Sequence, residues 1–323
     1  MHSSIVVPLD GSAFGKRALP AALVLARRST APVHIVHVHE RSYEETLGAY
    51  AGVGQGYDPR LYEELRQAMR TDLIALAAQI TRETSLPVDA EFLDGPVVPT
   101  LQRYLADRRP GLVVMMTHGR GGISRAWLGN VAVGLIHHSP VPVLLIRSGA
   151  EWPGNLIEPL FRRVLVPLDG SAMAEKVLDH VISLGTSDAT GYTLLTVVVP
   201  PPPLLDTPAP GHLSLSGRSD VERQRDAALA YLTTAAEGLR QRGAARVDTL
   251  VVVRPRAAEG ILNEAEAQQA DLIALATHGR GAVGRFFLGS VADKVVRGAS
   301  LPVLVYRPDG APASAPELRS SPP

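Results

Sequence analysis

Two stretches of the chain repeat the same arrangement of small and polar residues. Residues 117–130 read THGRGGISRAWLGN, and residues 277–290 read THGRGAVGRFFLGS. In each, an apolar run ends, closely spaced glycines follow, and another glycine precedes a helical pattern. Glycine lets successive backbone N–H groups converge on one point, and the first N–H groups of a helix are unpaired. This spacing predicts a loop and a helix start that together hold a polyphosphate.

In the second stretch the predicted donors are Gly279, Gly289 and Ser290. Ser290 is expected to cap the helix that contains VADKVV. Arg280 and Arg285 could add positive charge. The alternative is structural, because any tight strand-to-helix connection uses glycine and a capping residue. Repetition of the same spacing in both stretches favours phosphate binding.

A second motif, VPLDGSA, occurs at 7–13 and again at 166–172. Each copy places an aspartate, Asp10 or Asp169, at the carboxyl end of a strand-like run. A carboxylate there can accept a hydrogen bond from an amine or hydroxyl of a nucleotide. Alternatively, it caps the helix that we expect to begin at the motif's last residue, together with the motif's serine. The two roles are compatible.

A third pair of matching segments follows in the same order, HHSPVPVLLIR at 137–147 and RGASLPVLVYR at 297–307. Three ordered matches at nearly one offset indicate a tandem duplication. We expect a first domain at 1–148, a linker at 149–160, and a second domain at 161–307. The end of the chain, 308–323, is rich in Pro, Ala and Ser and is expected to be disordered.

Short runs of Val, Ile and Leu alternate with helical patterns in each repeat. In the first repeat they predict strands at 5–9, 33–38, 88–92, 112–116 and 141–146, and a helix at 58–84. The matching helix of the second repeat is expected to open at a capping box at 219–222. Apolar runs without polar alternation are typical of parallel strands covered on both faces. The predicted fold class is α/β: two repeated open, twisted, mostly parallel five-stranded sheets flanked by helices, Rossmann-like and of the adenine-nucleotide-binding type.

Composition excludes several kinds of function. The 323 residues suffice for two domains, and the formal net charge of zero gives no basic surface for a nucleic acid. The absence of cysteine excludes disulfides, thiolate metal sites and a cysteine nucleophile. No signal peptide and no apolar run long enough for a membrane span is visible. We therefore expect a soluble, cytoplasmic protein that contacts neither nucleic acid nor membrane.

Other chemistry-bearing residues do not form a catalytic pattern. His37 and His39 would share one face of a strand, but the second repeat has no matching pair, so we expect no metal site. The serine of each VPLDGS motif follows an aspartate, yet no histidine is placed to complete a triad. We assign no catalytic residue, and any ATPase activity is expected to be weak.

The ordered set VPLDGS, THGRG, LG(S/N)VA and PVL resembles the universal stress protein family in tandem form. The resemblance covers nearly the whole chain apart from the linker and the tail. ATP-binding members of that family carry Gly-x2-Gly-x9-Gly-(Ser/Thr), whose loop and helix start bind phosphates and ribose. The first-strand aspartate approaches adenine there, and a valine after the second strand contacts it.

The resemblance therefore implies ATP, with or without Mg²⁺, as the ligand. The residues that it implies in the second repeat are Asp169, Val197, Ala276, Gly279, Arg280, Gly289, Ser290 and Val291. Those that it implies in the first repeat are Asp10, Val38, Gly119, Gly129 and Asn130.

The two repeats depart from the family pattern to different degrees. The family's first glycine falls on Met116 in the first repeat and on Ala276 in the second. If that backbone is left-handed, a Cβ costs about 1–2 kcal/mol; if it is extended, only the bulk of the side chain matters. Asn130 also replaces the serine of the pattern. We therefore expect ATP chiefly in the second repeat, with the first repeat binding weakly or serving a structural purpose.

The last strand of each repeat is apolar and lies at the expected edge of its sheet. Universal stress proteins dimerise through this strand, so the resemblance implies an intrachain pseudo-dimer and in addition a homodimer. The alternative is that Pro140, Pro142 and Pro302 protect these edges from pairing. The predicted function is a nucleotide-responsive stress or regulatory module that binds ATP. A nucleotide-independent scaffold with unidentified protein partners and a slow ATP hydrolase are the alternatives.

Overall fold

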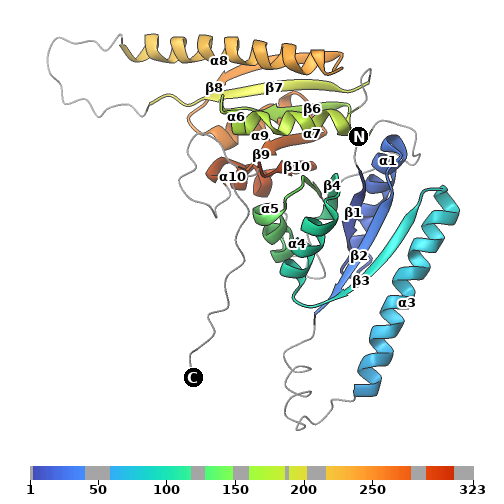
Figure 1. Ribbon diagram of the computed structural model, residues 1–323. Coiled ribbons are helices and arrows are strands. Elements are labelled where there is room, and N and C mark those ends of the chain that lie inside the picture. Colours follow the sequence, from blue (N-terminus) through green and yellow to red (C-terminus); the bar gives the residue numbers. More distant parts are fainter. Residues whose placement is uncertain are drawn as a thin grey trace, which may run out of the picture.

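The computed structural model describes residues 3–40, 59–117, 128–147, 160–185, 189–201, 216–277 and 289–308. Its strands form one ten-stranded sheet of order β3-β2-β1-β4-β5-β10-β9-β6-β7-β8 (Figure 1). We call residues 3–147 the first half and residues 160–308 the second half. Each half contributes five adjacent strands, and the described pairings within a half are all parallel.

The first half alternates strands and helices as the apolar periodicity predicts. Its elements are β1 (Ile5–Pro8), the 3-10 helix η1 (Gly15–Ala18), α1 (Leu19–Ser29), β2 (Val33–His39), α3 (Pro59–Thr84), β3 (Val88–Asp94), α4 (Val97–Arg108), β4 (Leu112–Met116), α5 (Asn130–His138) and β5 (Val143–Ile146). The strand expected at 141–146 begins two residues later, because Pro142 has no N–H group for the ladder.

The second half repeats this order. Its elements are β6 (Arg163–Pro167), α6 (Ala172–Glu175), α7 (Val177–Leu184), β7 (Gly191–Val198), α8 (Ser216–Gln241), β8 (Arg246–Val253), α9 (Ala257–Ala267), β9 (Leu272–Ala276), α10 (Ser290–Gly298) and β10 (Val303–Tyr306). The capping box predicted at 219–222 is wrong, because α8 already begins at Ser216. Residues 219–222 therefore lie inside the helix.

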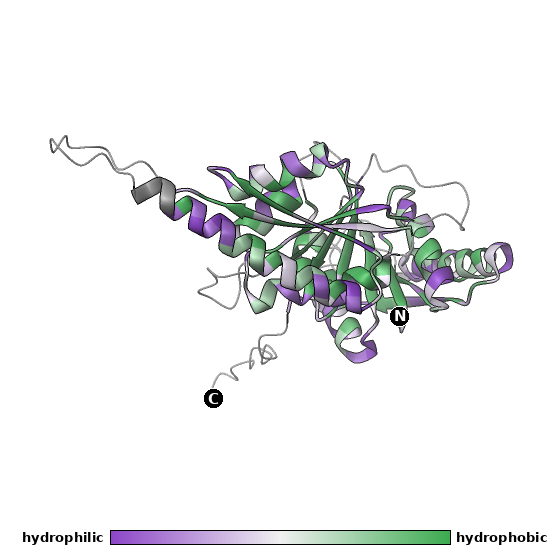
Figure 2. Cartoon of the chain, turned by 90° about the horizontal axis from the view of Figure 1, so that it is seen from above, coloured by the Kyte–Doolittle hydropathy of each residue, from purple (hydrophilic) through white to green (hydrophobic). Residues whose placement is uncertain are grey.

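The sheet separates two apolar cores, each continuous across both halves. Residues of α1, α3, α7 and α8 pack on one face, and residues of α4, α5, α9 and α10 pack on the other. Figure 2 shows hydrophobic strands in the middle layer and hydrophilic residues on the outer sides of helices. Coverage on both faces explains why the strands lack polar alternation. The predicted α/β fold class is confirmed.

The two halves join through their last strands. β10 pairs with β5 in antiparallel fashion, with Leu304 opposite Leu144 and Val303 opposite Leu145. All four of these side chains are buried. The intrachain pairing implied by the family resemblance is thus present. The prolines do not block it, because Pro142 and Pro302 lie just before the paired residues of β5 and β10.

The ends of the predicted domains fall mostly outside the described residues. Leu160, expected in the linker, is 7% exposed and packs in the core with Phe161. Residues 149–159 and 309–323 lie outside the described part of the chain, so the domain boundaries stay a prediction. Within the described residues, no helix is both long and apolar enough to cross a membrane.

Candidate functional site

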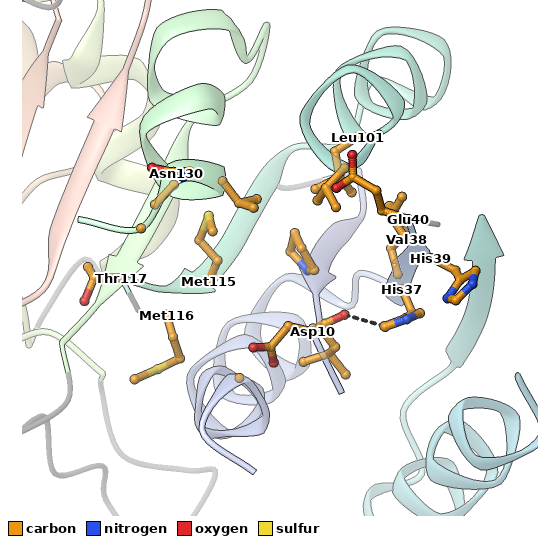
Figure 3. A pocket seen from close by; sticks show the side chains of 18 of the residues that line it. Asp10, His37, Val38, His39, Glu40, Leu101, Met115, Met116, Thr117 and Asn130 are labelled. Atoms are coloured by element: carbon orange, nitrogen blue, oxygen red, sulfur yellow. Dashed lines mark hydrogen bonds between the residues drawn. The ribbon is translucent and has the colours of Figure 1, made fainter. Parts of the chain in front are cut away.

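A cavity of about 550 Å³ opens at the carboxyl edge of the first half, beside the ends of β1, β2 and β4. β1 lies between β2 and β4, so the chain leaves this edge in opposite directions on its two sides. Such a switch point is where open α/β sheets place ligands. Thr117 and Asn130 lie at one end of the cavity, and Val38, His39 and Leu101 lie at the other (Figure 3).

Asp10 lines this cavity and also holds the turn that follows β1. Its Oδ1 accepts hydrogen bonds from the Ser12 N–H (2.9 Å) and the Ser12 hydroxyl (2.6 Å). Ser12 Oγ in turn accepts from the Gly15 N–H at 3.0 Å. Gly11, between the two motif side chains, has φ +79°, which glycine adopts without strain. The serine hydroxyl therefore holds the backbone of this turn, and the aspartate orients the serine.

The same turn recurs in the second half. Asp169 Oδ1 accepts from the N–H (3.0 Å) and hydroxyl (2.6 Å) of Ser171, and Ser171 caps α6 by accepting from the Ala174 N–H. The helix predicted at Ala172 is confirmed. In the first half the helical turn begins only at Gly15. Ser171 caps α6 and is held by Asp169, whereas η1 has no side-chain cap, so the predicted cap is present only in the second half.

The residue one position before the predicted valine contact secures the end of the first strand. His37 Nδ1 donates to the Leu9 carbonyl at 2.8 Å, and the Thr196 hydroxyl donates to the Leu168 carbonyl at 2.9 Å. A ring N–H and a hydroxyl thus do the same task. Sequence reasoning missed this role because the two side chains are chemically unlike.

Histidine rings form part of the first half's wall. His37 and His39 both stack on Phe92 of β3, with centroid separations of 5.3 and 6.0 Å. His39 Nε2 is 2.6 Å from the hydroxyl of Tyr62 on α3. Both members of the histidine pair considered from sequence as possible metal ligands thus contact aromatic side chains. No group of three or more His, Cys, Asp or Glu side chains suited to a metal gathers among the described residues.

Each glycine loop is closed by one backbone hydrogen bond. The Gly129 N–H donates to the Thr117 carbonyl at 2.9 Å, and the Gly289 N–H donates to the Thr277 carbonyl at 2.8 Å. Both threonines are 1% exposed. A Cβ on Gly289 would lie 2.8 Å from the Thr277 carbonyl oxygen, whereas a Cβ on Gly129 would lie 3.4 Å from that of Thr117.

The helix starts differ from the prediction in one detail. Ser290 and Asn130 are the first residues of α10 and α5, and the residues at the cap positions are Gly289 and Gly129. Neither cap makes a side-chain hydrogen bond, so the expectation that Ser290 caps its helix is wrong. Both side chains are exposed, Asn130 beside the first half's cavity and Ser290 at the carboxyl edge of the second half. Val291, the next residue, is 39% exposed.

Met116 and Ala276 occupy extended backbone at the ends of β4 and β9. Each pairs in a parallel ladder, with Ile146 and with Tyr306 respectively. Neither has a positive φ. The conformational cost that a left-handed backbone would impose does not arise, and at this position only the bulk of the methionine distinguishes the halves. Met116 lines the first cavity together with its neighbour Met115.

Three predicted ligand residues, Gly119, Gly279 and Arg280, lie outside the described residues. Of those described, Asp10, Val38, Gly129 and Asn130 line the cavity of the first half. No lysine or arginine is among the described residues that line it.

The other candidates, Asp169, Val197, Ala276, Gly289, Ser290 and Val291, occupy the corresponding strand ends and helix start of the second half.

The halves differ where the third strand meets the following helix. In the first half a Cβ on Gly95 (φ +133°) would lie 2.8 Å from Thr100 Oγ1. In the second half the glycine lies on the helix and the larger residue, Arg254, follows the strand. A Cβ on Gly260 would lie 3.1 Å from Arg254 Cγ and from Val197 Cγ1.

The charged groups near this position also differ between the halves. Arg254 forms an ion pair with Glu264 at 3.2 Å, and Glu264 is 8% exposed. In the first half a buried Tyr104 lies on α4, and burial raises its pKa to about 12. At this position the second half thus carries an ion pair, whereas the first half carries Tyr104.

The comparisons with known proteins agree with the repeated fold. The family model described as "Universal stress protein family" matches residues 1–147 and 160–307. Universal stress protein Mb2028c of Mycobacterium bovis is 26% identical over 311 residues, covering 94% of this chain and 96% of that protein. Universal stress protein Mb2019 of the same organism is 31% identical over 235 residues, covering 72% and 66%.

A solved structure shows the same fold over nearly the whole length. The crystal structure of a universal stress protein from Archaeoglobus fulgidus DSM 4304 matches with a TM-score of 0.62 and 18% identity, covering 94% of this chain and 98% of that one. With the family model matched to both halves, the repeated motifs and the paired five-stranded units have one explanation. The chain belongs to the universal stress protein family.

Proposed function

We propose that this universal stress protein binds ATP, alone or as its Mg²⁺ complex, chiefly in the second half, and acts as a nucleotide-responsive stress or regulatory module. The observation that carries the proposal is the Thr277–Gly289 hydrogen bond, which places the start of α10 beside the end of β9. Helix N-termini and convergent N–H groups favour phosphate.

The shape of the first half's cavity supports an adenine nucleotide over a bare anion. Its volume of about 550 Å³ lies within the range of small-molecule sites. Apolar side chains, including Val38 and Leu101, line the end away from Thr117 and suit the faces of a base. Asp10 lies between the two ends in Figure 3, where a ribose or base could donate to its carboxylate.

Two observations support a stronger site in the second half. Ala276 occupies the position where Met116 fills space in the first half. Ser290 keeps a small hydroxyl where Asn130 carries a larger amide. Because no three metal-binding side chains gather among the described residues, Mg²⁺ would enter with the phosphates of the nucleotide.

The decisive experiment is to denature purified protein, identify any released nucleotide and count it per chain, for wild type and for Gly289→Ala. A Cβ at residue 289 must displace the Thr277 carbonyl, which closes the loop. We expect about tenfold or greater loss of ATP affinity in this variant, because each hydrogen bond to a charged group contributes about 1.5–3 kcal/mol.

Gly129→Ala is the matched control, since its Cβ would make an ordinary contact at 3.4 Å. We expect this control to keep the wild-type ATP content. Equal losses in both variants would contradict the assignment to the second half. Absence of ATP in wild type, with no binding from millimolar MgATP, would favour the nucleotide-independent scaffold. A panel with ADP and cyclic AMP identifies the preferred nucleotide.

Assembly beyond one chain needs a surface other than the last strands. β5 and β10 already pair with each other, so neither is an open edge. A homodimer stays a prediction, as does the cytoplasmic location, and sedimentation of the purified chain tests the former.

A further inference from the structure

One guanidinium in the described part of the chain is buried without any hydrogen bond. Arg147 follows β5 and is 5% exposed, and its Nε, Nη1 and Nη2 atoms are all buried and unpaired. Burial removes the water that would satisfy these donors, so an acceptor must complete the site or its free-energy cost is high. A buried orphan of this kind points to a bound ion or ligand.

The equivalent residue of the second half is satisfied. Arg307 follows β10, and its Nη1 donates to the His137 carbonyl at the end of α5 in the other half. Arg147 makes no such contact with α10. Arg147 therefore does not make the contact between the halves that its pseudo-symmetric counterpart Arg307 makes.

The β4–β5 ladder shows where Arg147 lies. Met116 pairs with Ile146, and the Thr117 N–H donates to the Ile146 carbonyl at 3.1 Å. The next residues, Thr117 and Arg147, are therefore neighbours at the carboxyl edge. Side chains alternate along a strand, so Arg147 shares the face of Leu145, which packs in the core with residues of α5.

This position adjoins the polar end of the first half's cavity. Thr117, Gly129 and Asn130 line that end, where α5 begins with unpaired N–H groups. The described lining contains no cation, although a site for a multiply charged anion needs one. Among the described residues, Arg147, one strand away and without a hydrogen-bond partner, can supply it.

We propose that Arg147 is an anion-binding residue of the first half that takes a phosphate group, as free polyphosphate or as the phosphates of a nucleotide. A planar guanidinium donates two parallel hydrogen bonds to phosphate oxygens. The nucleotide form of this inference rests on the proposed function, whereas the anion site itself does not. It makes the first half a binding unit as well as a structural one.

Arg147→Gln tests the proposal, with Arg307→Gln as the matched control. Dissociation constants for ATP, adenosine and inorganic tripolyphosphate are measured by calorimetry on the full chain. We expect Arg147→Gln to weaken the binding of tripolyphosphate, and of ATP at one class of sites, about tenfold or more. The affinity for adenosine is expected to be unchanged. Arg307→Gln is expected to leave all three ligands unaffected.

Arg147→Met guards against a folding artefact. It removes the buried charge while keeping an apolar chain of similar length, so its ligand-free melting temperature is expected to equal or exceed that of wild type. Arg307→Met is expected to melt lower, because it loses the bond to His137.

The outcomes separate this inference from the proposed function. If wild type binds tripolyphosphate but no ATP, and Arg147→Gln abolishes that binding, the anion site stands and the ATP proposal fails. If wild type binds ATP and Arg147→Gln changes the affinity for neither ATP nor tripolyphosphate, the proposed anion site is wrong. A lower melting temperature of Arg147→Met without ligand would show that Arg147 serves the contact between halves, and would overturn the proposal.

Discussion

At the scale of single residues, polar side chains at the strand ends first fix the backbone and only then face the cavity. One carboxylate oxygen of Asp10 accepts from the Ser12 hydroxyl, and that hydroxyl oxygen accepts from the Gly15 N–H. The turn thus fixes the orientation of the carboxylate at the cavity.

Two histidines with lowered pKa values give the stability of the protein a pH dependence. Burial lowers the pKa of His180, which lies 4.1 Å from the Tyr306 ring between centroids, and also that of His138. The unfolded chain then binds protons more readily than the folded chain below the ordinary histidine pKa of 6.5. The free energy of unfolding is therefore expected to fall as pH drops below that value.

Urea titrations between pH 7.5 and 5 measure this effect, and His180→Phe provides the comparison. The variant keeps a ring against Tyr306 and loses the proton, so part of the decline with acid is expected to disappear. Identical pH slopes for wild type and variant would exclude His180 as a source of the dependence.

At the scale of elements, glycine sets how closely the helices of one layer approach. A Cβ on Gly134 of α5 would lie 2.6 Å from Val98 Cγ1 of α4, and one on Gly298 of α10 would lie 2.7 Å from Leu262 Cδ1 of α9. Both helix pairs thus use a glycine against a branched side chain. Close packing matters here because α5 and α10 present their first turns to the candidate sites.

Gly134→Ala is expected to destabilise the protein by about 1–3 kcal/mol, since overpacking forces Val98 or the helix to move. Gly238→Ala in α8 is the matched change, because no atom lies within 4 Å of its added Cβ. It is expected to stabilise by about 0.5–1 kcal/mol through lower backbone entropy of the unfolded chain. Chemical denaturation measures both. Effects of the same sign would refute the packing argument.

At the scale of the whole molecule, the β5–β10 seam makes two similar units one body. Both apolar cores continue across it, and Arg28 of α1 donates to the Leu184 carbonyl of α7 from the other half at 3.4 Å. Ligand binding in one half can therefore change the stability of the other through shared packing.

Leu304→Asp tests this cooperativity, because Leu304 is 0% exposed at the seam opposite Leu144. A buried carboxylate there costs several kcal/mol or forces the strands apart. We expect wild type to unfold in one calorimetric transition, and the variant to show two transitions and self-association through the opened edges. Leu229→Asp, on an exposed position of α8, is expected to unfold like wild type. A single, merely lowered transition for Leu304→Asp would argue against coupling through the seam.

The sequence by itself determined the duplication, the order of strands and helices, and the strand ends that carry Asp10 and Asp169. These follow from local periodicity and from internal repetition, which need no knowledge of distant contacts. The family resemblance added the pairing of the last strands, and the structure contains that pairing.

Tertiary structure decided what depends on residues far apart in the chain. The extended backbone of Met116 comes from its ladder with Ile146, and that ladder removes the conformational penalty considered from sequence. Thr196 in the second half does what His37 does in the first, because each places a donor within reach of a strand-end carbonyl. Arg147 and Arg307 are alike in sequence, yet only Arg307 finds an acceptor, because burial and hydrogen bonding are set by the surrounding fold.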